Sequence, residues 1–168
     1  MRVGVLTVSD RSAQGMREDA SGPLLCERLQ ERGWTVDKYD IVPDDENMIA
    51  RVLREWCDDM ELDLILTTGG TGFGRRDCTP EATLKVLSRQ APGLAEAMRR
   101  ASMEITPHAM LSRAVAGIRR NTLIINLPGS PKGAIENLQV VLPALPHAVQ
   151  LLQDDPRSES DHHKTSQA

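Results

Sequence analysis

A glycine-rich stretch, Thr67 to Thr79, holds the residue types best suited to chemistry. It reads Thr-Thr-Gly-Gly-Thr-Gly-Phe-Gly-Arg-Arg-Asp-Cys-Thr and follows the apolar run Leu64 to Leu66. Glycines let backbone N–H groups approach an anion closely, and Arg75 and Arg76 could neutralise its charge. The stretch therefore predicts a site for a phosphorylated ligand. The alternative is a tight turn that needs glycines for its own geometry.

Two standard nucleotide fingerprints do not fit this loop. Gly69 and Gly74 have the first spacing of a Walker motif, but Arg75 and Arg76 replace its Lys and Ser/Thr. The glycines at 70, 72 and 74 miss the dinucleotide fingerprint by one position. The loop alone therefore does not specify a known nucleotide motif.

Charged residues beside predicted strand ends extend the phosphate hypothesis. Mg²⁺ bridging phosphates needs one or two protein carboxylates, and the candidates are Asp10, Asp44, Asp45 and Asp77. The cations that could clamp phosphates are Arg75, Arg76, Arg113, Arg119, Arg120 and Lys132. Such a set suits phosphoryl or nucleotidyl transfer, which depends on positioning and charge neutralisation. Asp44 could equally be a simple helix cap, and Arg119-Arg120 a solvated turn.

Composition narrows the class of protein. The 168 residues suit one compact domain. A net charge of -4 and 2% aromatic residues argue against nucleic acid as a partner. Three cysteines without Cys-x-x-Cys spacing, no signal pattern and no membrane-length apolar run predict a soluble cytoplasmic protein with no membrane association. No serine or cysteine lies in a nucleophile-elbow pattern, so covalent catalysis is not expected.

The elements that must position these residues alternate between strands and helices. Short β-branched runs predict strands over 3–8, 34–42, 62–67 and 122–127. Helical spacing and capping signals predict helices over 23–32, from Asp44 or Asp45 to 57, from Thr79 as capping residue, and from Pro92 to about 105. Residues 11–22 read as a polar loop. Pro143 and Pro146 should break a last helical stretch before Leu152.

This alternation predicts an α/β fold, a three-layer α/β/α sandwich with a mainly parallel central sheet. Ligands of such sheets lie beyond the carboxyl ends of the strands. The segments there are Ser9-Asp10, Pro43-Asp44, the glycine-rich loop and Asn126 to Lys132, so they should converge on one rim. The polar residues 153–168 are predicted to be a disordered tail.

Seven short motifs occur in the order found in one family. They are Val-Ser-Asp at 8–10, Ser-Gly-Pro at 21–23, Val-Pro-Asp at 42–44, Thr-Gly-Gly-Thr-Gly at 68–72, Arg-Asp with Thr-Pro-Glu-Ala at 76–82, Leu-Ser-Arg at 111–113 and Asn-Leu-Pro-Gly at 126–129. Over residues 1–152 the chain resembles the molybdopterin adenylyltransferases, which include MogA and the G domains of plant Cnx and gephyrin. The resemblance implies a molybdopterin-binding fold and a homotrimer.

The activity implied by the resemblance is a step of molybdenum cofactor biosynthesis. AMP passes from Mg-ATP to the terminal phosphate of molybdopterin, which yields adenylyl-molybdopterin and pyrophosphate. Asp44 and Asp77 match the family's essential acidic positions and are expected to hold Mg²⁺ and the reacting phosphates. The substrate-binding residues implied are Ser9, Asp10, Gly69, Gly70, Thr71, Gly72, Arg76, Ser112, Arg113, Asn126, Pro128 and Gly129. A molybdenum insertase is a possible partner.

Two other readings of the resemblance stay open. MoaB-type paralogues share the fold, and a non-catalytic member would bind molybdopterin or its precursor without releasing pyrophosphate. A third reading is a scaffold whose trimer presents the C-terminal tail to other proteins. The compact spacing after Pro128-Gly129, without a long insertion, is closer to the G domains.

Overall fold

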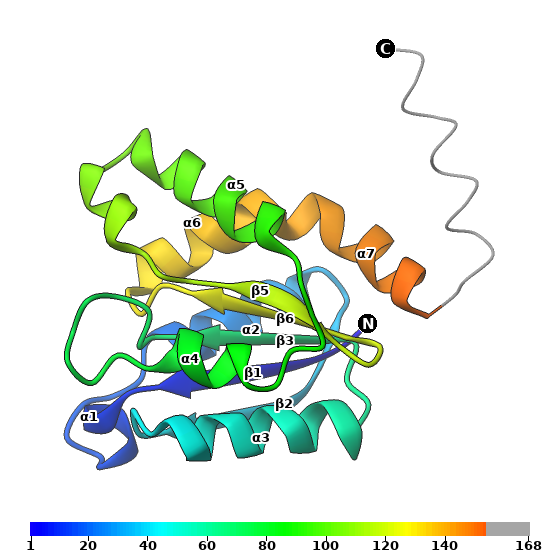
Figure 1. The fold of residues 1–168 in the computed structure, drawn as a ribbon, viewed down its shortest axis with the longest axis horizontal. Coiled ribbons are helices and arrows are strands. Elements are labelled where there is room, and N and C mark those ends of the chain that lie inside the picture. The colour runs from blue at the N-terminus through cyan, green and yellow to red at the C-terminus, as the bar shows by residue number, and fades with distance from the viewer. Residues whose placement is uncertain (154–168) are drawn as a thin grey trace.

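The computed structural model describes residues 1–153, and Figure 1 shows them as a sheet covered by helices. The strands are β1 (Arg2–Val8), β2 (Thr35–Val42), β3 (Leu64–Thr68), β4 (Arg89–Gln90), β5 (Ala116–Arg119) and β6 (Thr122–Leu127). The helices are α1 (Asp10–Ala13), α2 (Ser21–Glu31), α3 (Glu46–Asp58), α4 (Thr79–Leu84), α5 (Pro92–Met103), η1 (Pro107–Leu111), α6 (Pro131–Val141), η2 (Leu142–Ala144) and α7 (Leu145–Leu152). Apart from Gln153, the predicted tail lies outside the described residues.

The strand order is β2-β1-β3-β6-β5-β4, and β1, β2, β3 and β6 run parallel. The chain leaves β1 toward β2 on one side, and β3 continues toward β6 on the other. A topological switch point therefore lies between β1 and β3, where ligands of open α/β sheets bind. The predicted mainly parallel sheet is confirmed.

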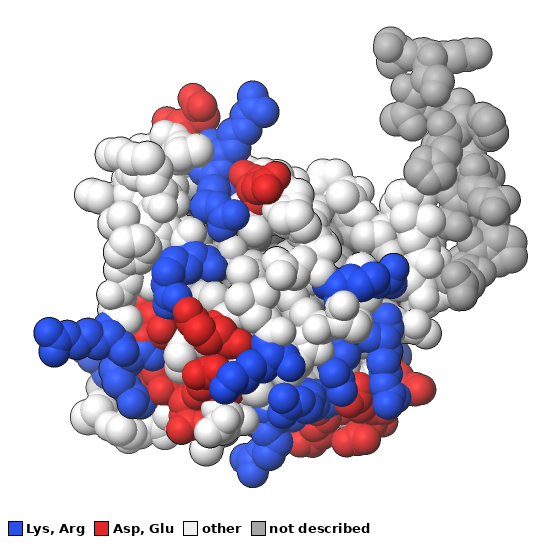
Figure 2. Space-filling model, viewed as in Figure 1, with Lys and Arg blue, Asp and Glu red and all other residues white. Residues whose placement is uncertain are grey.

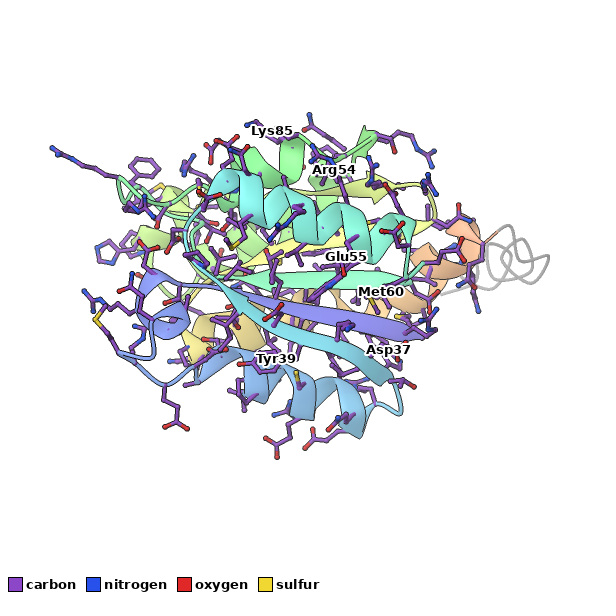
Figure 3. All side chains as sticks on the ribbon, turned by 90° about the horizontal axis from the view of Figure 1, so that it is seen from below. Asp37, Tyr39, Arg54, Glu55, Met60 and Lys85 are labelled. Atoms are coloured by element: carbon purple, nitrogen blue, oxygen red, sulfur yellow. The ribbon has the colours of Figure 1, made fainter. Side chains whose placement is uncertain are left out.

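Two apolar clusters, one on each face of the sheet, form the core. Alternate strand residues enter different clusters: Val5 and Leu66 pack with α2, α5, α6 and α7, whereas Leu6 and Ile65 pack with α3 and α4. This follows from the two-residue period of a strand. Figure 3 shows α3 and α2 on opposite sides of β2 and β1. The three-layer sandwich is confirmed.

Some predicted details are wrong. The four predicted strands omit β4 and β5, which run antiparallel to β5 and β6, respectively. Strand β4 is an exposed two-residue edge strand, and β5 has only four residues, one of them a glycine, so neither has a strand-like apolar pattern. Residues 11–22 are not all loop, because α1 covers Asp10–Ala13 and α2 begins at Ser21.

The last helices agree with the prediction, since η2 separates α6 from α7 at Pro143. At α4 the capping prediction is wrong: Thr79 is the first helical residue, and its Oγ1 donates to the carbonyl of Gly69 at 2.8 Å. No helix within residues 1–153 has the length and apolar character needed to cross a bilayer.

Candidate functional site

A cleft of about 580 Å³ opens at the carboxyl ends of β1 and β3. We call it the carboxylate cleft, because Asp44 and Asp77 line it together with Gly69 and Gly70. Its other walls are residues 17–21 and the turn 129–131. Figure 2 shows carboxylates gathered near the glycine-rich loop and α4, with basic side chains around them. The segments predicted to converge on one rim therefore meet there.

Asp10 and Asp44 hold the ends of β1 and β2 together by a reciprocal exchange. The backbone N–H of Asp10 donates to Asp44 Oδ2 at 2.9 Å, and that of Asp44 donates to Asp10 Oδ1 at 3.0 Å. The Arg76 guanidinium donates to both Asp10 oxygens, at 3.0 and 3.1 Å. This hydrogen bonding lowers the pKa of Asp10. Arg76 thus already has a carboxylate partner.

Asp44 is also not the helix cap that the sequence left open. Asp45 caps α3, with its Oδ1 accepting from the N–H of Met48 at 2.8 Å. At the start of α1, Ser9 has the same role, because its Oγ accepts from the N–H of Ser12. The Asp44 carboxylate therefore does not cap α3, and it lines the carboxylate cleft.

Asp77 organises the glycine-rich loop from within. Its Oδ2 accepts hydrogen bonds from the N–H groups of Gly72 and Gly74, both at 3.0 Å. The expectation that the loop N–H groups point at an anionic ligand is therefore wrong for these two. Because a carboxylate has about four acceptor positions, Asp77 can still bind a cation.

The donor set fits a divalent cation. Burial raises the pKa of Asp44, and the charges of Asp10 and Asp77 raise it further against the hydrogen bond from the Asp10 N–H. A cation would relieve this repulsion, and Mg²⁺ needs only one or two carboxylates when phosphates and water complete its shell. Among residues 1–153, no group of three or more His, Cys, Asp or Glu could hold a metal by itself. Asp44 and Asp77 therefore suit Mg²⁺ delivered with phosphates.

Gly69 and Gly70 are required where the loop leaves β3. Their φ angles are +100° and +62°, in the region that favours glycine. A Cβ at Gly69 would stand 2.2 Å from the carbonyl oxygen of Val8. A Cβ at Gly70 would stand 2.4 Å from Thr79 Oγ1 and 2.9 Å from Asp44 Oδ1. These glycines let the loop lie directly against β1 and Asp44.

Two hydroxyl groups hold the turn at Pro128 and Gly129. Thr68 Oγ1 donates to the carbonyl of Pro128 at 2.7 Å, and Ser21 Oγ donates to that of Gly129 at 2.8 Å. Ser21 is set in turn by Asp19, whose Oδ1 accepts from its N–H at 3.0 Å. Sequence reasoning did not select Asp19 or Thr68. Asp19 lies four residues before the predicted helix 23–32 but only two before the observed start of α2 at Ser21, so the misplaced helix start concealed its capping position.

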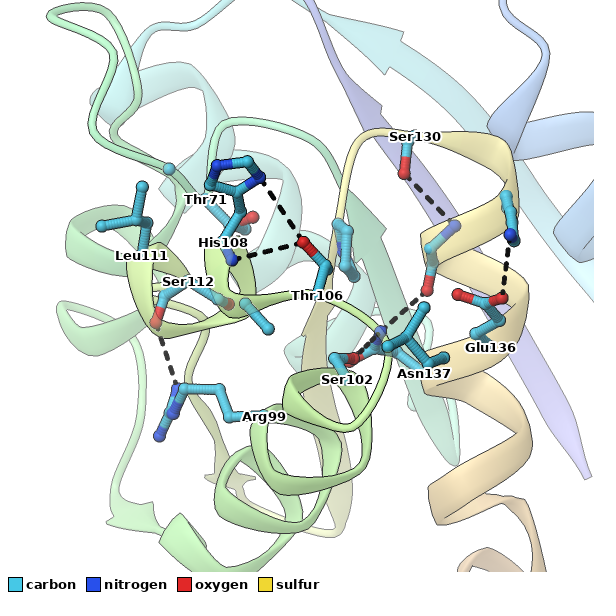
Figure 4. Close-up of a pocket in the computed structure, with 16 residues that line it drawn as sticks. Thr71, Arg99, Ser102, Thr106, His108, Leu111, Ser112, Ser130, Glu136 and Asn137 are labelled. Carbon is cyan, nitrogen blue, oxygen red and sulfur yellow. Dashed lines mark hydrogen bonds and ion pairs between the residues drawn. The ribbon is translucent and has the colours of Figure 1, made fainter.

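A second cleft of about 510 Å³ lies on the other side of the glycine-rich loop (Figure 4). Thr71, Gly72, Pro128 and Ser112 line it with residues from α5, η1 and α6. Its walls mix apolar surface, as at Ile105 and Leu111, with polar groups. The polar lining residues that the sequence did not indicate include Arg99, Ser102, Thr106, His108, Glu136 and Asn137. Lys132, which also lines this cleft, pairs with Glu136, with 3.8 Å between its Nζ and Glu136 Oε1.

Two predicted binding residues point elsewhere. Asn126 is fully buried, and its Nδ2 donates to Thr67 and Thr83 hydroxyls at 2.9 Å. Its Oδ1 accepts from the N–H of Val115. Arg113 uses its guanidinium on the glycine-rich loop and on Glu81. Neither side chain lines a cleft, and both connect the surrounding segments by hydrogen bonds.

Arg119 and Arg120 do not reach the rim. Both pair with Asp58 at the C-terminal end of α3. Because β5 is antiparallel to β6, its last residue Arg119 lies opposite Thr122, at the amino end of β6. The hypothesis that these two arginines clamp phosphates is wrong.

Cys78 follows Asp77 but is not suited to nucleophilic attack. Burial, and then the charges of Asp44 and Glu46, raise the pKa of its thiol to about 11. The thiol is therefore protonated at neutral pH, whereas the thiolate is the reactive form.

The mainly parallel sheet and the clefts at its carboxyl edge define the class as α/β proteins of the open-sheet type, whose ligands bind at that edge. Residues 4–147 match the family described as "Probable molybdopterin binding domain". The chain belongs to this molybdopterin-binding family.

Known proteins similar to the chain carry related names. Molybdopterin adenylyltransferase of Helicobacter pylori strain J99 is 46% identical over 154 residues, covering 90% of this chain and 88% of that protein. Gephyrin of Dictyostelium discoideum is 48% identical over 166 residues; the match covers 93% of this chain but only 23% of gephyrin. The crystal structure of the molybdopterin biosynthesis enzyme MoaB from Thermus thermophilus superposes with a TM-score of 0.87 at 54% identity, covering 92% of this chain and 98% of that one.

Proposed function

We propose that this protein is a molybdopterin adenylyltransferase of molybdenum cofactor biosynthesis. It transfers AMP from Mg-ATP to the terminal phosphate of molybdopterin and releases pyrophosphate. Family membership and the Helicobacter relative, which has this name and nearly the same length, support the proposal. We extend it to a homotrimer in the cytoplasm that passes its product to a molybdenum insertase.

The observation that carries the proposal is that the two clefts share a wall. Ser130 lines both clefts, and successive residues of the glycine-rich loop border the carboxylate cleft, at Gly69 and Gly70, and the second cleft, at Thr71 and Gly72. A transfer between two substrates requires adjoining sites that bring their reacting groups together. A single-ligand binding protein has no need of this arrangement.

The chemistry of the walls assigns one substrate to each cleft. Asp44 and Asp77 would bind the Mg²⁺ that accompanies a triphosphate, so ATP occupies the carboxylate cleft. The second cleft combines apolar surface with amide and hydroxyl groups, such as Asn137 and Ser102, which suits a pterin ring. The phosphate of molybdopterin then lies at the shared wall, facing the ATP phosphates.

The reaction at this wall is a displacement at phosphorus. A phosphate oxygen of molybdopterin bonds to the α-phosphorus of ATP while the bond from that phosphorus to the pyrophosphate oxygen breaks. The attacking oxygen is already anionic, so no general base is required. Bound Mg²⁺ supplies charge compensation to the phosphates, and Asp44, Asp77 and the glycine-rich loop supply position.

Pyrophosphate release tests the proposal. Asp77→Asn should reduce molybdopterin-dependent release at least about 100-fold, because it removes the charge that binds Mg²⁺. The amide oxygen can still accept from the N–H groups of Gly72 and Gly74, so the fold should persist. The assay supplies Mg²⁺, ATP and molybdopterin to purified protein, and circular dichroism checks the fold.

Asp59→Asn is the matched control, since Asp59 is exposed at the far end of α3. It should release pyrophosphate at the wild-type rate. Normal turnover by Asp77→Asn would contradict the role given to Asp77. Tight molybdopterin binding by the wild type without any release would identify the chain as a binding-only, MoaB-type paralogue instead.

A further inference from the structure

Arg113 connects the glycine-rich loop to the segment that follows η1. Its backbone N–H donates to the carbonyl of Thr71 at 2.9 Å. Its Nε donates to the carbonyl of Gly72 at 2.7 Å and its Nη2 to that of Asp77 at 2.9 Å. The third nitrogen, Nη1, pairs with Glu81. All three guanidinium nitrogens are therefore committed to residues 72–81.

These contacts fix the loop residues that carry Asp77. Gly72 is held at both polar backbone groups, because its N–H donates to the Asp77 carboxylate and its carbonyl accepts from Arg113. A glycine-rich loop has little side-chain packing to define its shape and depends on such contacts. The planar fork of Arg suits two carbonyls and a carboxylate at once, whereas a Lys ammonium is a single point of charge.

The neighbouring residue faces the other cleft. Ser112 has an extended backbone (φ -72°, ψ 119°), and consecutive side chains of an extended chain point in opposite directions. Ser112 lines the second cleft, while Arg113 reaches the loop. From the cleft side, Arg99 Nη1 donates to the carbonyl of Ala114 at 2.8 Å. The segment 112–114 therefore contacts a lining residue of each cleft, Arg99 in the second cleft and Asp77 in the carboxylate cleft.

We propose that Arg113 is a positioning residue that couples occupancy of the second cleft to the geometry of Asp77. A ligand against Ser112 fixes segment 112–114, and Arg113 transmits this to Gly72 and Asp77. Molybdopterin then strengthens nucleotide binding in the carboxylate cleft, and by linkage nucleotide strengthens molybdopterin binding equally. The inference rests on the proposed function, because it takes molybdopterin and ATP as the two ligands.

Binding of an unreactive nucleotide measures the coupling without turnover. The probe is an ATP analogue with a methylene group between the α and β phosphorus atoms, titrated with Mg²⁺ in the presence and absence of molybdopterin. In the wild type molybdopterin should lower the Kd of the analogue about tenfold, within the usual range of such couplings. In Arg113→Lys the two Kd values should agree within about twofold.

Steady-state kinetics provide a second reading. Arg113→Lys should lower kcat about 10- to 100-fold, because small misplacements of reacting groups are costly, while the KM for molybdopterin changes less than about threefold. Arg119→Lys is the matched control, since Arg119 also commits all three guanidinium nitrogens, to Asp58 and the carbonyl of Val86. Arg119→Lys should show the same coupling and the same kcat as the wild type, even if it lowers the stability of the protein.

Amide hydrogen exchange tests the inference without a variant, and so applies even if Arg113→Lys does not fold. Molybdopterin alone should slow exchange at Gly74, whose N–H is bound by Asp77 and which does not line the second cleft. Unchanged exchange there would overturn the inference. Three binding results would also overturn it. They are a tenfold coupling that persists in Arg113→Lys, a coupling that Arg119→Lys loses to the same extent as Arg113→Lys, and no coupling in a wild type that releases pyrophosphate. Absence of pyrophosphate release, with coupling present, would count only against the proposed function.

Discussion

The carboxylates at the rim hold the backbone in place, in addition to the ligand-binding role proposed for Asp44 and Asp77. Asp10, Asp44, Asp77 and Asp19 each accept hydrogen bonds from backbone N–H groups of neighbouring segments. Residue type and position indicated the acidic rim but not this use. Burial and the neighbouring charges of Asp10 and Asp77 raise the pKa of Asp44, so a bound cation would stabilise its charged form.

Asp19 illustrates the structural use and gives a prediction at the residue scale. Burial alone would raise its pKa, but hydrogen bonds from Thr7, Tyr39 and the N–H groups of Gly22 and Ser21 outweigh burial and lower it. A lowered pKa in the folded protein means stabilisation that is complete above the unfolded pKa of about 4. This stabilisation is lost as the pH falls through the lower folded pKa.

Asp19→Asn should therefore lower the free energy of unfolding by about 1–2 kcal/mol at pH 7, because the usual range of about 1.5–3 kcal/mol for hydrogen bonds to a charged group is reduced by solvent screening at this partly exposed carboxylate. The difference from wild type should shrink as the pH falls below about 4. Urea unfolding at pH 7 and pH 3 measures both values. A difference that is equal at the two pH values would mean that the Asp19 charge does not stabilise the fold.

At the scale of elements, the junction of β3 and the glycine-rich loop decides the geometry of the site. The loop turns back at Gly69 and Gly70 and is tied to α4 through Thr79, whose hydroxyl donates to Gly69. Strand β3 itself is fully buried between β1 and β6. The loop therefore starts from a rigid strand and ends on a helix, which holds Asp77 in place.

Gly70→Ala should disturb this junction. Its φ of +62° costs a non-glycine residue about 1–2 kcal/mol, and the added Cβ would displace Thr79 Oγ1 and Asp44 Oδ1. We expect a loss of unfolding free energy and a larger loss of pyrophosphate release, at least about tenfold. Thermal unfolding and the release assay measure the two effects.

Gly33→Ala is the control that separates backbone strain from the displacement of neighbouring atoms by the added Cβ. Gly33 has a φ of +74°, but a Cβ there meets nothing within 4 Å. This variant should lose similar stability and keep full activity. Equal losses of activity in both variants would show that Gly70 acts only through general stability.

At the scale of the whole molecule, the sheet order places both clefts on one side of the domain. The chain connects β1 to β2 on one side and β3 to β6 on the other, so the switch point lies between β1 and β3. The turn after β6 lies beside this point and lines both clefts through Ser130. The exposed apolar side chains of Met103, Ile105 and Met110 lie around the end of α5 and η1. Apolar surface of this kind is available for contacts between subunits.

The proposed homotrimer gives the prediction at this scale. Light scattering after size-exclusion chromatography should give three times the chain mass at micromolar concentration. The shorter chain 1–153 should give the same result, because the described domain contains the core and both clefts. A monomer under these conditions would contradict the proposed assembly, and a trimer lost on truncation would assign assembly to residues 154–168.

The sequence by itself determined the alternating elements, the three layers and the rim where the motifs meet. These follow from local information: apolar periodicity, helix signals such as Pro92, and the rule that parallel strands end at one edge. The ordered motifs also indicated the family. The short strands β4 and β5 were not predicted because they form by pairing, β5 with β6 and the edge strand β4 with β5, rather than from a pattern of their own.

Only the tertiary structure decided which polar groups line the clefts and which are turned into the protein. Arg113 reaches Gly72 from 41 positions away, and Asn126 is buried against Thr83, 43 positions away. The second cleft likewise joins α5, η1 and α6 with the glycine-rich loop. A hydrogen bond or a cleft depends on distances between such remote segments, whereas sequence patterns report only the neighbours of each residue.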